Sequence, residues 1–184
     1  MKKVLTIIGV TVVIIAAAIL VFLASLGYFR KVEVVERRTG PYSYVYREFK
    51  GPYMNTKTVF DEVYKIVKAE GCNPEKGIGI YFDDPAKVPA AELRSKCGCI
   101  IEGADLAKLP VLKEKLAFDE LKEADSLVVE FPIKNAMSYM IGPMKAYPAI
   151  SKAALEKKYK FTDVGVEIYD EPAKKIYFIF QYFR

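Results

Sequence analysis

The segment from Gly165 to Tyr169 contains one acidic side chain, Glu167, among glycine, apolar and aromatic residues. If the segment is a β-strand, side chains alternate along it, so Gly165, Glu167 and Tyr169 share one face. An earlier segment of similar sequence places Gly79 and Tyr81 on the equivalent face. A carboxylate among such neighbours is costly to desolvate unless a cation or a hydrogen-bond donor meets it, so we expect its pKa to be raised. The alternative is that Glu167 lies on the solvent face of its strand.

Two other groups of reactive residues are better explained by folding than by chemistry. Cys97 and Cys99 could hold zinc or cycle to a disulfide, but they lack the usual two-residue gap, and only Cys72 could join them. We interpret them as buried or edge thiols, since free cysteine often behaves as a small hydrophobic residue. Asp83 and Asp84 resemble paired acid and base carboxylates, but adjacent strand residues point apart and Asp-Asp-Pro favours a turn. The sequence therefore predicts no metal site.

The composition excludes several other kinds of site. The chain of 184 residues contains no histidine, which rules out imidazole-ligated haem, a histidine-based zinc centre and a Ser-His-Asp triad. The net charge of +5 is spread among acidic residues rather than gathered in a stripe, so we expect no nucleic-acid partner. No cofactor is predicted.

The segments that carry the candidate site recur within the chain. A Gly-Pro pair, a helical stretch, a strand ending in Ile-Tyr and a turn of the form acidic-Pro-Ala-Lys appear twice in the same order. The first copy lies at 51–52, 77–81 and 84–87, and the second at 142–143, 165–169 and 171–174. Such self-similarity indicates a duplication. We therefore expect two related units, at about 32–102 and 126–184, with a ligand cleft at their junction.

Local signals predict the elements that position these residues. Apolar residues at spacings of three and four predict an amphipathic helix that begins near Asn55 or Thr56 and ends at Gly71. Runs of β-branched and aromatic residues predict the strands. These are 32–35, 42–49, 78–82, 127–131, 136–141, 164–169 and 175–183, with a second helix near 148–158 and a polar helical connector at 105–125. The predicted fold class is α+β, with antiparallel strands and helices on one face.

The N-terminal segment differs from the rest of the chain. Residues 4–26 carry no charge and are almost all Val, Ile, Leu, Ala or Phe, enough as a helix to cross a ~30 Å hydrocarbon core. The alternative is a cleaved secretory signal, but the apolar region of a signal is normally about 7–15 residues. We therefore predict an uncleaved transmembrane helix and its flanks at 1–31, followed by one domain at 32–184.

The predicted anchor implies a single-pass membrane protein with the lipid bilayer as a partner. Lysine and arginine residues flank the apolar run on both sides, so their bias does not decide the orientation. An odd number of cysteines and the absence of an Asn-x-Ser/Thr sequon favour a cytosolic location for the domain.

Several motifs resemble those of the GyrI-like (gyrase-inhibitor-like) effector-binding domains. They are Gly79 to Pro85 followed by Val88-Pro89, Arg94-Ser95 and Cys97-Gly98, together with Arg47 to Tyr53 and Val166 to Tyr169. The resemblance covers residues 32–184 and implies a duplicated unit related by a pseudo-twofold axis, with a ligand cleft at its centre. It also implies that Glu167 corresponds to the strand glutamate that meets cationic aromatic ligands in this family.

Within that family, the chain is most similar to the membrane-anchored branch related to the testis-expressed autophagy receptor of the endoplasmic reticulum. The resemblance rests on the N-terminal helix and on the stretch around Cys97 and Cys99. The acidic tail of that receptor has no counterpart here, so we do not expect receptor function. The DNA-binding helix-turn-helix of the family's transcription regulators has no counterpart either.

These observations favour a membrane-anchored small-molecule-binding protein over an enzyme. The ligand, aromatic or cationic, would have Glu167 as its counter-charge, Tyr81 and Tyr169 as stacking walls, and room above Gly79. In the enzyme alternative, the protein is a hydrolase in which Glu167 acts as acid or base on a small electrophile. A further alternative is a membrane-tethered protein-interaction module.

Overall fold

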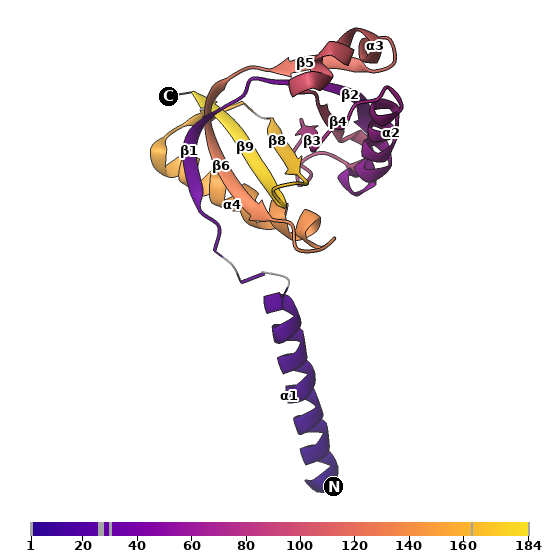
Figure 1. The fold of residues 1–184 in the computed structure, drawn as a ribbon. Helices are drawn as coiled ribbons and strands as arrows, with labels where there is room; N and C mark the ends of the chain where they lie inside the picture. The colour runs from indigo at the N-terminus through magenta and orange to yellow at the C-terminus, as the bar shows by residue number, and fades with distance from the viewer. Residues whose placement is uncertain (1, 26–27, 30, 163, 184) are drawn as a thin grey trace.

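The structure is a computed structural model that describes residues 2–25, 28–29, 31–162 and 164–183, except for the side chains at positions 2, 5, 23 and 25. The helices are α1 (Lys2–Ser25), α2 (Thr56–Ala69), α3 (Leu109–Lys113) and α4 (Ser138–Lys157), with short 3-10 segments at Tyr53–Asn55, Ala90–Glu92 and Gly103–Lys108. The strands are β1 (Val34–Thr39), β2 (Tyr42–Lys50), β3 (Lys76–Tyr81), β4 (Arg94–Ile100), β5 (Ala117–Leu121), β6 (Ala124–Pro132), β7 (Lys160–Phe161), β8 (Gly165–Asp170) and β9 (Lys175–Phe183). The fold is α+β: α1 projects away from a curled antiparallel sheet on which the other helices pack (Figure 1).

The strand order of the sheet is symmetric about its central pair. The order is β1-β6-β9-β8-β3-β4-β2-β5, with β7 added beside β9, and every pairing is antiparallel. Each half contains a strand, a helix and a strand pair in the same succession, so β2, α2, β3 and β4 match β6, α4, β8 and β9. The first strands are exchanged: β1 pairs with β6 in the second half, and β5 pairs with β2 in the first. The central strands β3 and β8 therefore join the two halves.

The helices α2 and α4 cover the outer strands of one face of the sheet. The apolar stripe of α2 buries Val63 and Val67 against Val45 on β2, and the helix ends before Gly71, whose φ of +79° favours glycine. Buried residues of α4, including Ile150, pack on β6 and β9. A third cluster of buried residues fills the opposite face of the central strands. The two helices leave β3 and β8 between them, and side chains of those strands meet there.

Two predicted elements in the second half differ from the structure. Residues 136–141, predicted as a strand, form a turn and the start of α4, which begins ten residues before the predicted helix at 148. The Ser138 hydroxyl accepts hydrogen bonds from the amides of Lys134 and Asn135, which stabilises this earlier start. The helix also continues through Pro143 and Pro148. Because proline is disfavoured inside a helix, these residues argued against a helix of this length in the sequence.

The predicted polar connector at 105–125 is also different. It contains a 3-10 segment and α3, whose buried Leu112 joins the cluster beneath α2. It then forms β5, an edge strand. Pairing with β2 over Tyr42 to Tyr46 gives the backbone of this polar segment its hydrogen bonds, so tertiary context overrides the weak local strand signal.

The predicted membrane anchor is not supported. Among the described residues, no helix is both long enough and apolar enough to cross a membrane. This finding overturns the transmembrane helix at 1–31, the single-pass membrane location and the bilayer as a partner.

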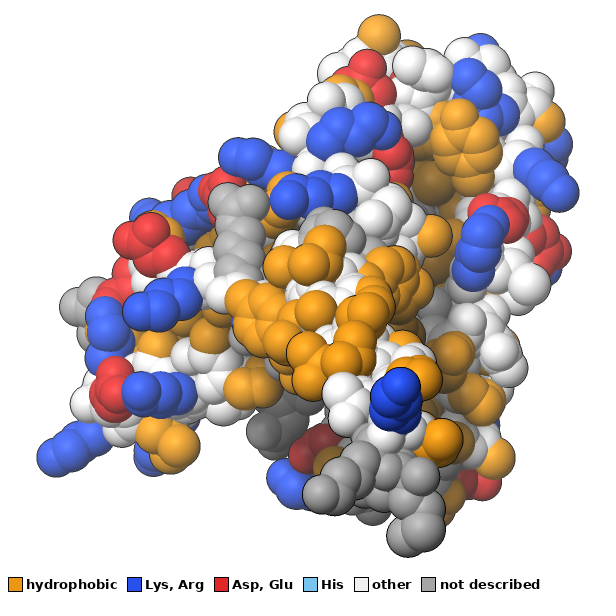
Figure 2. Space-filling view, turned by 90° about the horizontal axis from the view of Figure 1, so that it is seen from below, with side chains coloured by type: hydrophobic (Ala, Val, Ile, Leu, Met, Phe, Trp, Pro, Cys, Tyr) orange, Lys and Arg blue, Asp and Glu red, His pale blue; other side chains and the backbone are white. Residues whose placement is uncertain are grey.

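Figure 2 views the molecule from below, the side on which α1 projects, and shows hydrophobic side chains gathered in the middle of that face.

Candidate functional site

The central strands β3 and β8 pair so that, on one face, each large side chain lies opposite a glycine of the other strand. The pairs are Tyr81 with Gly165, Glu167 with Gly79, and Tyr169 with Gly77. Directly opposite residues of an antiparallel pair point to the same face. This is also the face that α4 covers further out, because Glu167 is paired on its other side with Phe178, a core residue beneath α4.

Glu167 is the centre of a chain of tyrosine hydrogen bonds. Its side chain is 4% exposed. The Tyr147 hydroxyl, from α4, donates to Oε1, and the Tyr169 hydroxyl donates to Oε2 at 2.8 Å. Because Tyr169 has a single hydroxyl proton, its oxygen accepts the hydrogen bond that joins it to Tyr81 at 2.9 Å. Burial raises the pKa of all three tyrosines well above the usual value, so they remain protonated donors.

The carboxyl group of Glu167 has no cationic partner among the described residues. Burial raises its pKa from 4.5 to about 7, against the opposing effect of the hydrogen bonds from Tyr147 and Tyr169. In the part of the chain that the structure describes, it forms no ion pair, whereas Glu36 and Glu130 each form an ion pair with a lysine. At neutral pH the site therefore holds a carboxyl group near its midpoint of ionisation, in surroundings that disfavour its charge.

Further aromatic rings pack against Tyr81 and Tyr169, the tyrosines of this hydrogen-bonded chain. Tyr53 meets Tyr81 edge to face with ring centroids 4.8 Å apart, and Phe60 of α2 meets Tyr169 in the same way at 5.4 Å. The ring centroid of Tyr139, on α4, lies 5.7 Å from that of Tyr169. The hydroxyl of Tyr53 contacts the carbonyl oxygens of Asp83 and Arg94, so this ring is fixed to the backbone. Side chains from both halves of the sheet therefore build one aromatic site.

The structure brings the four predicted site residues together, but the room expected above Gly79 is filled. A Cβ atom added to Gly79 would lie 2.8 Å from Cε2 of Tyr81 and 2.9 Å from its hydroxyl oxygen. The Tyr81 ring thus folds along its own strand over the glycine instead of forming a wall beside an open space.

Four aromatic residues of the site were not predicted from the sequence: Tyr53, Phe60, Tyr139 and Tyr147. Tyr147 was missed because the second helix was predicted to begin one residue after it, although it lies one helical turn before the buried Ile150. Tyr53 lies in the 3-10 segment before α2, where no periodic pattern marks its direction.

The other sequence candidates lie elsewhere or serve the fold. The cysteines 72, 97 and 99 are buried free thiols, and burial raises the pKa of Cys97 to about 11 and that of Cys99 to about 12. Asp83 accepts hydrogen bonds from the backbone and guanidinium of Arg94, which fixes the turn after β3. Among the described residues, no three histidine, cysteine or acidic side chains are placed to hold a metal ion.

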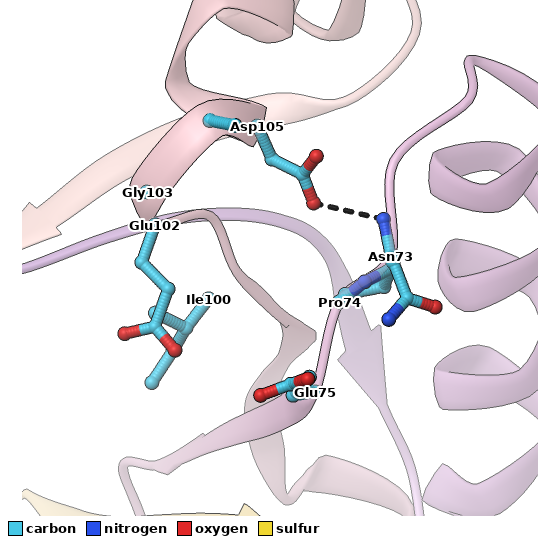
Figure 3. A pocket seen from close by; sticks show the side chains of 8 residues that line it. Asn73, Pro74, Glu75, Ile100, Glu102, Gly103 and Asp105 are labelled. Carbon is cyan, nitrogen blue, oxygen red and sulfur yellow. Dashed lines mark hydrogen bonds between the residues drawn. The ribbon is translucent and has the colours of Figure 1, made fainter.

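A separate cavity of about 300 Å³ lies near the start of β3 (Figure 3). It is lined by residues 73–75 and by Ile100 and residues 102–105. Asp105 accepts the backbone N–H of Asn73 at 2.8 Å, and Glu102 is paired with Lys76. These acidic groups are satisfied by the protein itself.

No protein-family model and no curated protein matches this chain. Solved structures do match. The C-terminal domain of EcmrR has a TM-score of 0.59 and 10% identity, over 83% of this chain and 98% of that domain. EcmrR in its complex with DNA is matched over 91% of this chain and 64% of EcmrR, with a TM-score of 0.58 and 12% identity. SAV2435 bound to tetraphenylphosphonium has a TM-score of 0.55 and 9% identity, over 82% of this chain and 94% of SAV2435. A hydrolase from Listeria innocua has a TM-score of 0.51 and 10% identity, over 88% of this chain and 98% of the hydrolase.

Identities this low establish a shared fold alone. The fold is consistent with the GyrI-like effector-binding fold that the sequence motifs resemble. None of these structures supports the narrower resemblance to the membrane-anchored receptor branch.

Proposed function

We propose that this protein binds small aromatic cations, with Glu167 as the counter-charge. The observation that carries the proposal is a buried carboxyl group that lacks a basic partner among the described residues and is surrounded by tyrosine and phenylalanine rings. A cationic ligand would supply the missing charge and lower the electrostatic cost of ionising Glu167. Aromatic faces around the ligand would add cation–π attraction.

The comparisons support this proposal through one ligand. SAV2435, which shares the fold, was solved with tetraphenylphosphonium, a cation covered by aromatic rings. A site that accepts such a ligand must combine negative charge with apolar and aromatic surface, and the surroundings of Glu167 offer both.

The test is a calorimetric titration of wild type and of Glu167→Gln with tetraphenylphosphonium and rhodamine 6G. We expect micromolar binding by the wild type and at least about tenfold weaker binding by Glu167→Gln, which loses a charge-assisted interaction. Glu48→Gln is a matched control, because Glu48 also lies on a strand but is exposed. If the wild type binds neither cation, or Glu167→Gln binds both as tightly, the proposed function is wrong.

A second candidate is a hydrolase in which Glu167 transfers a proton. A general acid or base works best when its pKa lies near the working pH, and the pKa of Glu167 is raised to about 7. The Tyr147 hydroxyl, which donates to Oε1, would hold the carboxyl group in position for this transfer. The test is hydrolysis of a small aromatic epoxide, with a bell-shaped or sigmoidal pH profile in the wild type and loss of activity in Glu167→Gln. Turnover equal in wild type and variant would exclude this role.

A further inference from the structure

We propose that this protein takes up its cation in exchange for a proton, and that Thr56, three hydrogen bonds away from Glu167, controls this exchange. The inference rests on the proposed function and adds how the site is regulated. In the empty site the carboxyl group of Glu167 is protonated. When a cation binds, the O–H bond breaks, the proton passes to solvent, and the carboxylate that remains pairs with the cation.

The chain of hydroxyl groups at Glu167 continues beyond Tyr81 to the start of α2. The Tyr81 hydroxyl is hydrogen-bonded to the hydroxyl of Thr56, which contacts the backbone carbonyl of Tyr53 at 2.8 Å. Thr56 is 7% exposed and Glu167 is 4% exposed, so both ends of the chain are buried. The chain thus has four contacts: Glu167 with Tyr169, Tyr169 with Tyr81, Tyr81 with Thr56, and Thr56 with the carbonyl.

The number of protons along the chain decides which form of Glu167 it suits. Each contact needs one proton, and each hydroxyl group has only one to donate. A carbonyl oxygen can only accept, so Thr56 donates to Tyr53. Tyr81 must then donate to Thr56, and Tyr169 must donate to Tyr81. No hydroxyl proton is left for the contact between Tyr169 and Oε2, so only a protonated Glu167 completes the chain.

Ionisation of Glu167 reverses the chain and costs one of its contacts. Tyr169 then donates to Oε2, Tyr81 donates to Tyr169, and Thr56 donates to Tyr81. The hydroxyl of Thr56 no longer has a proton for the carbonyl of Tyr53. The empty site therefore favours the protonated form twice, through this hydrogen bond and through the desolvation of a buried charge. Burial raises the pKa of Glu167 to about 7, which agrees with this preference.

Among the described residues, the titratable groups around Glu167 carry no charge that could replace the proton. They are tyrosine hydroxyls and one thiol, which stay protonated at neutral pH because burial raises their pKa values. A bound cation can therefore take the place of the proton. The groups are Tyr53 before α2, Tyr81 on β3, Cys97 on β4 opposite Gly79, Tyr147 on α4 and Tyr169 on β8.

The first experiment counts the protons released when the full chain binds tetraphenylphosphonium, whose charge does not depend on pH. Calorimetric titrations at one pH in two buffers with different heats of protonation give this number. For the wild type we expect about one proton per cation at pH 5.5 and close to none at pH 8.5. Because the cation binds the ionised form, its affinity should rise about tenfold from pH 5 to pH 6 and level off above pH 8.

The second experiment repeats the titrations with Thr56→Val, since valine has the shape of threonine but ends the chain at Tyr81. Two contacts then remain for two hydroxyl protons, so Glu167 no longer needs its own proton. We expect binding about two- to eightfold tighter than in the wild type at pH 5.5, and equal binding at pH 8.5. Thr56→Ser keeps the hydroxyl group and should behave as the wild type. Thr58→Val is the matched control, because the exposed Thr58 makes the same kind of contact with the carbonyl of Asn55.

The results that overturn the inference are distinct from failure of the proposed function. If the wild type releases less than about a fifth of a proton at pH 5.5, Glu167 is already ionised in the empty site and the exchange is wrong. This count does not depend on whether any variant folds. In that case tetraphenylphosphonium still binds in a manner that depends on Glu167, whereas failure of the proposed function means that no variant binds it.

Carbon-13 NMR of the empty protein tests the role of Thr56 without a ligand. The carboxyl group of Glu167 should titrate at a pH about 0.5–1 lower in Thr56→Val than in the wild type, and Thr56→Ser should restore the wild-type midpoint. A purely structural role of Thr56 would leave the midpoint unchanged. Equal midpoints in wild type and Thr56→Val would therefore refute the control that we assign to this residue.

Discussion

The raised pKa of Glu167 predicts how the stability of the protein depends on pH. The pKa is raised from 4.5 to about 7 in the folded state, so the folded state binds this proton more tightly than the unfolded state. The proton's contribution to stability is complete below pH 4.5 and is lost as the pH rises through 7. Each unit of pKa corresponds to about 1.4 kcal/mol, so the loss is about 3 kcal/mol. The side chain is 4% exposed, so solvent screening does not reduce this figure much.

Glu167→Gln removes this dependence, because glutamine does not titrate. We expect the variant to become more stable than the wild type above pH 7, with a difference that grows by about 3 kcal/mol between pH 4.5 and pH 8. Any cost from turning an amide NH₂ toward a tyrosine hydroxyl is the same at every pH and does not enter this difference. The assay is urea denaturation followed by circular dichroism at half-unit pH steps, with Glu48→Gln as the exposed control. A difference between variant and wild type that stays constant with pH would refute the reasoning.

Three further predictions concern the neighbourhood of the site and the domain boundary. Tyr147→Phe removes a hydrogen bond that lowers the pKa of Glu167, so that pKa should rise further above 7, as measured by carbon-13 NMR of the carboxyl group; an unchanged pKa contradicts the assigned contact. Gly98→Ala should destabilise the protein by about 3 kcal/mol in urea denaturation, because its Cβ would lie 2.1 Å from the carbonyl oxygen of Val45; a loss under about 1 kcal/mol would contradict this. The fragment 32–184 should fold alone, because the buried clusters contain none of the described residues of α1, and a circular dichroism spectrum without secondary structure would place the boundary elsewhere.

The sequence was sufficient to predict the face on which the candidate site lies. Alternation along a strand has a period of two, so Glu167 and Tyr169 share a face in any antiparallel arrangement. The duplication then placed Gly79 and Tyr81 on the equivalent strand, and the two strands pair in the structure. These features depend on local geometry and on one internal comparison, both of which can be read from a single chain.

The remaining features depend on contacts between distant segments or on side-chain rotamers. The contact of Tyr147 with Glu167 requires α4 to lie over β8, and the two prolines in α4 hid the start of that helix. The edge strand β5 forms because β2 offers it a hydrogen-bonding partner. The direction of the Tyr81 ring follows from packing against Tyr53 and Gly79, and no periodic pattern encodes a rotamer.

The exchange of first strands sets the order in which the sheet can be completed during synthesis. β1 leaves the ribosome before every other strand, but Val34 pairs with Val129 on β6, so most of the domain must be made before its partner exists. Until then β1 is an unpaired edge, and such edges promote aggregation. Before β6 is made, the charges of the exposed Arg37 and Arg38 would keep that edge solvated and repel other chains. The first strand to emerge is thus left without a partner until β6 has been made, and its charges keep it soluble during that interval.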